Sequence, residues 1–320
     1  MMVAASERCG RRCNFEILCY LVRVPAQTNV SFCQNDLAKK PGSGPYPSLL
    51  LLIPAYNEER RIEPVLRDYA RFFQEQYHGK FQIVVVLNGC TDNTLGVVQK
   101  VAKDFTSVSY LNFPGPIGKG GALIEGLKLA PFGDLIGYTD ADGATPPHAF
   151  LNLVRHINAA DCVIGSRWLP GAVIHQSQAS HRQFASRAFH RIVQLLFWLN
   201  IRDTQCGAKV MKREVVEKVH PFLHIADMAF DINLLVAIKR AGYRIREVPT
   251  EWTDKAGSKV TLFRSSLTML LSVVRIRLIY WPWVYRLLRP LRPLEGWVYT
   301  KLHAPRPRLG PGENKNGEGI

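Results

Sequence analysis

Two acidic residues two positions apart are the groups in this sequence whose types and spacing most clearly suggest chemistry. Asp140 and Asp142 lie in YTDADGATPP, residues 138–147, where an apolar run ends and a turn rich in Gly and Pro begins. In an extended segment, residues i and i+2 point to one side, so both carboxylates can bind one hard divalent cation. Such a cation would neutralise a bound diphosphate. A solvated surface turn is the alternative, and the position directly after an apolar run favours the metal site.

Two more polar motifs also follow apolar runs. PAYNEE covers residues 54–59, and NGCTDNT covers residues 88–94. In sheets whose strands run parallel, ligands bind at the carboxyl ends of the strands. Three such motifs after three apolar runs therefore predict one shared ligand site.

The elements that must position these motifs alternate between buried strands and helices. Continuous apolar runs predict strands at residues 48–54, 81–87, 108–113, 134–139 and 161–166. Apolar residues at helical spacing predict helices at residues 61–77, 95–105 and 118–130. Helices between successive strands imply right-handed crossovers. The sequence therefore predicts an α/β, Rossmann-like fold with a mostly parallel sheet flanked by helices.

Lys119 is a candidate ligand for a phosphate. It lies in GKGGAL, residues 118–123, at the start of a predicted helix. Glycine-rich backbone at a helix N-terminus, with a cation beside it, suits an anionic donor group. The segment lacks the full P-loop pattern, which excludes kinases and ATPases of that class.

Charge and composition narrow the possible partners. The chain has 320 residues, of which 47% are hydrophobic, and its net charge of +15 favours anionic partners. We expect no nucleic-acid partner, because the sequence contains no nucleic-acid-binding motif. Seven cysteines without regular spacing favour free thiols. Cys9 and Cys13 lack the CxxC pairs or histidine cluster of a zinc site.

The C-terminal part changes in character. Residues 261–300 hold three of the six tryptophans together with arginines that interrupt the apolar run before it reaches bilayer-spanning length. This mixture predicts amphipathic helices at a membrane interface, with a core-packing helix as the alternative. We expect residues 1–47 to form an extension and linker, residues 48–260 the main domain, and residues 301–320 a disordered tail.

Six segments occur in a familiar order: LLIPAYNEE, GKGGAL, DADGATPP, GSR, DTQCGAKV and GSK. The chain resembles family 2 glycosyltransferases of the GT-A fold in this respect, from about Ser48 to Val260. The resemblance implies a nucleotide site lined by Pro54, Tyr56, Asn57 and Glu58. The alternative for Asn57 and Glu58 is that they cap the following helix. Relatives carry an acidic pair after the second strand, where this chain has Leu87 and Asn88, so Asn88 would meet the base or ribose.

The segments TDADGAT and RDTQCGAKV look like the branch of the family that makes dolichyl-phosphate glucose. Resemblance to polyprenyl-phosphate sugar synthases implies that Arg167, Arg182 and Ser186 bind the acceptor phosphate. Arg182 and Ser186 are four residues apart and would share a helix face, although an ordinary exposed arginine is the alternative for Arg182. Lys259 of GSK would close over the diphosphate.

Asp203 and Asp231 are further candidate acids. Both lie among apolar or family-matched residues, where an unpaired carboxylate would be costly. Either can order the site or act as a base, and an internal salt bridge is a third possibility for Asp203. A lipid monophosphate already carries an oxyanion at neutral pH, so it needs no strong general base.

The resemblance implies an inverting transfer of a hexose, glucose, from UDP-glucose to a polyprenyl or dolichyl phosphate. Mg²⁺ or Mn²⁺ would be held by Asp140 and Asp142, and Asp142, Asp203 and Arg167 would be the catalytic residues. We expect a membrane-associated enzyme with its active site facing the cytosol, at the endoplasmic reticulum or a bacterial inner membrane. The alternatives are a GDP-mannose donor, a non-lipid glycan acceptor, or a non-catalytic module that binds a nucleotide sugar or a membrane.

Overall fold

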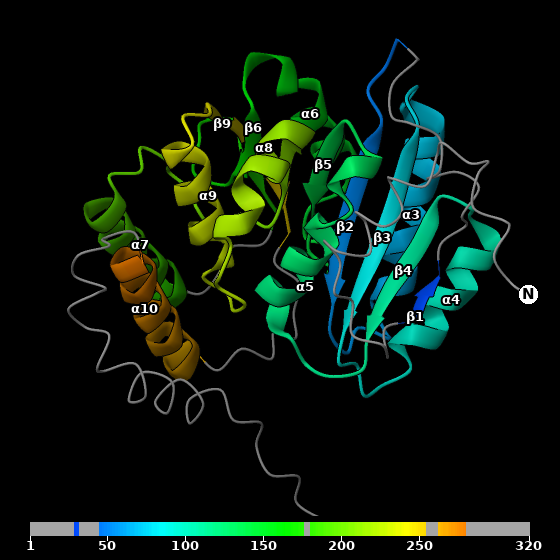
Figure 1. Cartoon of the computed structure of the whole chain (residues 1–320), viewed down its shortest axis with the longest axis horizontal. Helices are drawn as coiled ribbons and strands as arrows, with labels where there is room; N and C mark the ends of the chain where they lie inside the picture. Colours follow the sequence, from blue (N-terminus) through cyan, green and yellow to red (C-terminus); the bar gives the residue numbers. More distant parts are fainter. Residues whose placement is uncertain (1–28, 32–44, 176–179, 254–261, 280–320) are drawn as a thin grey trace, which may run out of the picture. The chain divides into compact units, whose positions relative to one another are not determined.

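The computed structural model describes residues 29–31, 45–175, 180–253 and 262–279 (Figure 1). The chain divides into two compact units, Met1–Ser258 and Lys259–Ile320. The second unit contributes one described helix, α10 (Leu262–Ile279). Within the described residues, no helix has the length and apolar character needed to cross a membrane. The rest of the predicted interfacial segment, residues 280–300, and the predicted tail lie outside the described residues.

The first unit is built on an eight-stranded sheet in the order β1-β4-β3-β2-β5-β8-β6-β9. Its strands are β1 (Asn29–Ser31), β2 (Leu49–Ala55), β3 (Phe81–Asn88), β4 (Val108–Phe113), β5 (Leu135–Tyr138), β6 (Cys162–Ser166), β8 (Lys209–Lys212) and β9 (Ile245–Pro249). The five strands predicted from apolar runs are β2 to β6. The pairs β4-β3, β3-β2, β2-β5 and β6-β9 are parallel, which confirms the mostly parallel sheet.

Two strands run against this direction, and the apolar pattern indicated neither. β1 lies within the predicted N-terminal extension and pairs antiparallel with β4. β8 is inserted between β5 and β6 and is antiparallel to both. Because of this reversal, the start of β8 lies beside the carboxyl end of β5, where Lys209 pairs with Tyr138. A second, two-stranded parallel sheet is formed by β7 (Val173–Ile174) and β10 (Glu251–Trp252).

Helices connect the strands and cover the sheet. They are α3 (Ile62–Gln76), α4 (Thr94–Asp104), α5 (Gly118–Leu127), α6 (Pro147–Arg155), α7 (Ser180–Phe197), α8 (Arg213–Val219) and α9 (Phe230–Arg240), with short 3₁₀ turns at Ala130–Phe132, Ile157–Ala159 and His220–Phe222. The three predicted helices correspond to α3, α4 and α5. α6 begins at Pro147, because proline is tolerated at a first helical position, where no N–H bond is required.

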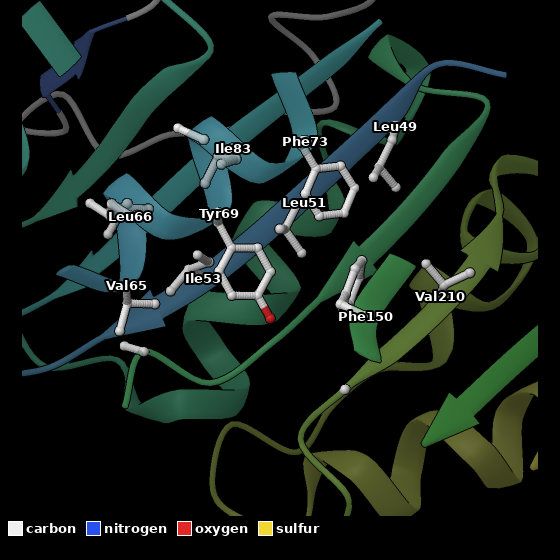
Figure 2. Packing of buried hydrophobic residues seen from close by; sticks show 14 of the residues in the cluster. Leu49, Leu51, Ile53, Val65, Leu66, Tyr69, Phe73, Ile83, Phe150 and Val210 are labelled. Atoms are coloured by element: carbon white, nitrogen blue, oxygen red, sulfur yellow. The ribbon is translucent and has the colours of Figure 1, made fainter. Parts of the chain in front are cut away.

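The two faces of the sheet carry separate apolar layers, because side chains alternate along a strand. On one face, alternate residues of β2 and β3 pack against α3, α4 and α6. Figure 2 shows this layer around the rings of Tyr69, Phe73 and Phe150. On the opposite face, Gly126 of α5 packs against Leu52 and Val86. The parallel pairing of β2 with β3 and β5 places the carboxyl ends of all three strands at one edge of the sheet.

Candidate active site

The acidic pair lies directly after β5, as predicted. The Nζ atom of Lys119 is 2.6 Å from Oδ1 of Asp140, so the glycine-rich segment and the acidic turn meet. Asp142 accepts a hydrogen bond from the backbone N–H of Ala144 at 2.9 Å. Burial, followed by repulsion from the Asp140 carboxylate, raises the pKa of Asp142 above its ordinary value. The turn therefore concentrates negative charge that a bound cation would relieve.

These residues fit a divalent cation. Two carboxylates supply hard oxygen donors, and a donor diphosphate would supply more. No group of three His, Cys, Asp or Glu side chains arranged to hold a metal occurs in the described ranges. Mg²⁺ at phosphate sites is usually held by one or two carboxylates together with the substrate, which fits Asp140 and Asp142.

The start of α5 is held tightly in place. Gly118 has φ +77°, and a Cβ there would lie 2.3 Å from the carbonyl oxygen of Ala226, so only glycine fits. The side-chain oxygen of Asn88 accepts hydrogen bonds from the N–H groups of Ile117 at 2.6 Å and Gly118 at 3.1 Å. Asn88 thus orders the segment that carries Lys119. Its side-chain oxygen, which we expected to contact a base or ribose, binds this backbone instead.

The loop after β2 is bound to the loop after β3. Asn57 has φ 55°, and its side chain accepts from the N–H of Thr91 at 2.8 Å and donates to the Thr91 hydroxyl at 3.1 Å. Glu58 binds Arg61 through both carboxylate oxygens, at 2.7 and 2.8 Å. No side chain caps the first turn of α3, but the backbone carbonyl oxygen of Glu58 accepts from the N–H groups of Arg61 and Ile62 at 2.9 Å, so Glu58 caps this helix through its backbone alone. Pro54 is buried within β2, and half of the Tyr56 side chain is exposed.

Arg167 and Asp203 form an ion pair after β6. Arg167 donates from Nε at 2.7 Å, from Nη2 at 2.9 Å and from its backbone N–H at 3.0 Å to the Asp203 carboxylate. Asp203 is 1% exposed; burial alone would raise its pKa, but the bonds from Arg167 outweigh burial and lower it. An ionised carboxylate with three such bonds is suited to holding Arg167 in place, which favours the positioning role over the general base.

Asp231 also has partners, and they are buried. Its Oδ1 atom accepts from Nζ of Lys209 at 2.5 Å and from the hydroxyl of Tyr138 at 2.5 Å. Burial alone would raise the pKa of Asp231, and Lys209 followed by Lys119 lowers it instead. The three side chains link α9, β8 and β5 beneath the acidic turn. This arrangement favours ordering of the site over a role as base.

Three candidates cannot be placed at the level of side chains. Arg182 and Ser186 lie on α7, one turn apart, and their side chains are outside what the structure describes. Lys259 lies outside the described residues. Their predicted contacts with acceptor phosphate and diphosphate stay predictions.

The structure adds three residues that the sequence analysis did not single out. Trp252 of β10 packs its ring 5.2 Å from the guanidinium carbon of Arg167. Gly207 lies so close to Asp140 that a Cβ there would be 2.0 Å from Oδ2. Arg61 contributes positive charge near Asp142. DTQCGAKV was a sequence signal for Gly207, but no local pattern pointed to Trp252 or Arg61.

Known proteins are similar to this chain in sequence and in fold. The Glycosyl transferase family 2 model matches residues 51–220. Dolichyl-phosphate beta-glucosyltransferase of Saccharomyces cerevisiae is 33% identical over 74% of this chain and 76% of its own length. Glycosyltransferase AglD of Haloferax volcanii is 31% identical over 70% of this chain, and the match spans 36% of AglD. Glucosyl-3-phosphoglycerate synthase of Mycobacterium tuberculosis, solved with Mg²⁺ and UDP, matches with a TM-score of 0.54 at 18% identity, covering 72% of this chain and 79% of that one.

Proposed function

This chain belongs to glycosyl transferase family 2, and we propose that it transfers glucose from UDP-glucose to the phosphate of a dolichyl or other polyprenyl lipid. The observation that carries the proposal is the match to the yeast dolichyl-phosphate glucosyltransferase, which spans about three quarters of both chains. The contact of Lys119 with Asp140 after β5, and the ion pair of Arg167 with Asp203 after β6, support it.

The donor would bind at the ends of β2, β3 and β5. Asp140 and Asp142 would hold Mg²⁺ or Mn²⁺, which supplies positive charge to the leaving diphosphate. In the same proposal Lys119 contacts the diphosphate, and Lys259 closes over it. Base and ribose contacts are assigned to Pro54, Tyr56, Asn57, Glu58 and Asn88. The engaged oxygen of Asn88 leaves its amide N–H₂ for the nucleotide.

The acceptor would bind beside Arg167. Asp203 engages two of the five side-chain N–H donors of that arginine, so three others can reach phosphate oxygens. Arg182 and Ser186 complete the proposed acceptor set. The phosphate oxyanion attacks the anomeric carbon as the bond to the diphosphate breaks, which inverts the configuration. Because this oxyanion exists at neutral pH, positioning and charge carry the catalysis and no general base is required.

We propose that the protein binds a membrane surface, with its active site on the cytosolic side. The end of α7 supports a membrane contact, because Ile192 and Leu195 lie about one turn apart on this helix and Trp198 directly follows it. These three residues are 37%, 78% and 81% exposed. Arg191 is exposed beside Ile192, and Lys239 donates to the carbonyl oxygen of Trp198. Exposed tryptophan and leucine among cations suit an anionic lipid headgroup layer.

Vesicle flotation tests the membrane contact. The full chain should float with vesicles of phosphatidylcholine and phosphatidylserine, and the double change Leu195→Ser and Trp198→Ser should lower the bound fraction severalfold. Tyr46→Ser is the matched control, because Tyr46 is also an exposed aromatic residue, at 51%, before β2. Equal flotation of the double variant and the wild type would remove this surface from the proposal.

The transfer reaction is tested with radiolabelled donors. UDP-glucose and GDP-mannose are supplied separately with short-chain polyprenyl phosphate and Mg²⁺ or Mn²⁺, and the lipid is extracted. Label in the lipid from UDP-glucose alone, lost in Asp142→Asn, is the expected result. Label from GDP-mannose would change the donor, and label in a soluble glycan would change the acceptor. Metal-dependent nucleotide binding without any transfer would identify a non-catalytic module.

A further inference from the structure

The two-residue strand β10, with the residue that follows it, contacts both the acidic turn after β5 and Arg167 after β6. It pairs in parallel with β7, where the N–H of Val173 donates to Thr250 at 3.1 Å and the N–H of His175 donates to Trp252 at 3.2 Å. The next residue, Thr253, donates its N–H to the carbonyl oxygen of Ala144 at 2.9 Å. Ala144 belongs to the acidic turn after β5. One short strand therefore connects the proposed donor side to the neighbourhood of Arg167.

The guanidinium carbon of Arg167 lies over the indole ring of Trp252, 5.2 Å from the ring centroid. Asp203 binds one edge of the same guanidinium group. The Arg167 side chain is 18% exposed, so water weakens this contact less than it would at the surface. A planar cation bound along one edge by a carboxylate and held against an aromatic ring has a fixed orientation. Its remaining N–H donors then point in a defined direction.

The other residue of β10 fixes the strand itself. One carboxylate oxygen of Glu251 is 2.7 Å from Nε2 of His148, and the other is 2.8 Å from Nε2 of His175. His148 lies in the first turn of α6, and His175 follows β7. Consecutive strand residues point to opposite faces, so this clamp and the indole of Trp252 lie on opposite faces of β10. Holding Glu251 therefore holds Trp252.

We propose that Trp252 is a positioning residue for the acceptor phosphate, acting through Arg167, and that the clamp of Glu251, His148 and His175 fixes the strand that presents it. The inference rests on the proposed function in one respect, namely that Arg167 binds the acceptor. It predicts that losing the indole weakens acceptor binding and leaves donor binding unchanged. A residue needed only for folding would affect both substrates.

Steady-state kinetics with UDP-glucose and short-chain polyprenyl phosphate separate these possibilities. Trp252→Leu should raise KM for the acceptor about five- to thirtyfold, the range of one desolvated cation–π contact, with KM for the donor within twofold. Trp252→Phe keeps an aromatic face and should restore most of the acceptor affinity. Glu251→Ala should raise acceptor KM in the same direction by a smaller factor. Trp168→Leu, next to Arg167 in sequence, is the control and should change neither constant beyond twofold.

An equal rise in both KM values, or an unchanged acceptor KM in Trp252→Leu, would overturn the inference. A second measurement does not depend on the acceptor. The ¹⁵N-edited NMR signal of the Arg167 Nε–H group, identified by its loss in Arg167→Lys, should shift and exchange faster with water in Trp252→Leu. An unchanged signal would refute the positioning role, whereas a changed signal in an enzyme without lipid transfer would refute only the proposed acceptor.

Discussion

Replacing Gly207 with alanine would test how strictly the Asp140 carboxylate must be placed. The new Cβ would lie 2.0 Å from Oδ2 and 2.6 Å from Cγ of Asp140, whereas real Cβ contacts stay beyond 3.0 Å. The carboxylate must therefore move by about 1 Å, and its 2.6 Å contact with Lys119 must lengthen or break. A displacement of about 1 Å at a catalytic group lowers rates about a hundredfold.

The expected result is a loss of about a hundredfold in kcat/KM for lipid glucosylation, with little loss of stability. Gly207 has no positive φ, and the atom it meets is the end of a side chain, so the free energy of unfolding in urea should fall by about 1 kcal/mol or less. Gly115→Ala is the control, because nothing lies within 4 Å of its added Cβ. Full turnover in folded Gly207→Ala would refute the idea that Asp140 must occupy this position.

Three further changes test the charges at the site. Asp203→Asn leaves the Arg167 guanidinium without its carboxylate, so the free energy of unfolding in urea should fall by about 2–3 kcal/mol; an unchanged value would show that the pair is weak. Lys209→Met should cost about 3–5 kcal/mol, measured in the same way. The depressed pKa of Asp231 gives the wild type stability that is present above the ordinary Asp pKa and lost as pH falls through the depressed value. In Lys209→Met, burial instead raises this pKa, so urea titrations should show stability decreasing as pH rises; parallel pH curves for the two proteins would contradict this. The raised pKa of Asp142 makes protons compete with metal, so Mn²⁺ affinity measured by calorimetry should fall as the solution is acidified, and a flat profile would argue against Asp142 as a ligand.

The sequence predicted those parts of the fold that depend on local pattern. The apolar runs of β2 and β3 are long and uninterrupted, which is typical of central parallel strands covered on both faces. The motifs after them were therefore placed correctly at one edge of the sheet. β8 was missed because its four residues begin and end with lysine, and no local rule indicates that Lys209 is buried. Its burial is stabilised by Asp231, 22 residues away in sequence.

The site was predicted less completely than the fold, because partners distant in sequence determine what each side chain does. Asn88 ends β3 and Glu58 follows β2, but the backbone of α5 and the side chain of Arg61 engage the groups that we had assigned to the nucleotide. Trp252 gave no signal, because its contact with Arg167 exists only after β10 pairs with β7. Among the described residues, the cysteines Cys90, Cys162 and Cys206 are free thiols.

The antiparallel strand β8 also works as a spacer. It lies between β5, which ends before Asp140, and β6, which ends before Arg167. Neighbouring strands are about 4.8 Å apart, so the backbone at these two ends is held roughly 10 Å apart. Backbone hydrogen bonds in the middle of the sheet set this gap, and the surrounding loops do not. Changes in the loops should therefore leave constant the backbone spacing beneath Asp140 and Arg167, the residues proposed to hold the donor and the acceptor.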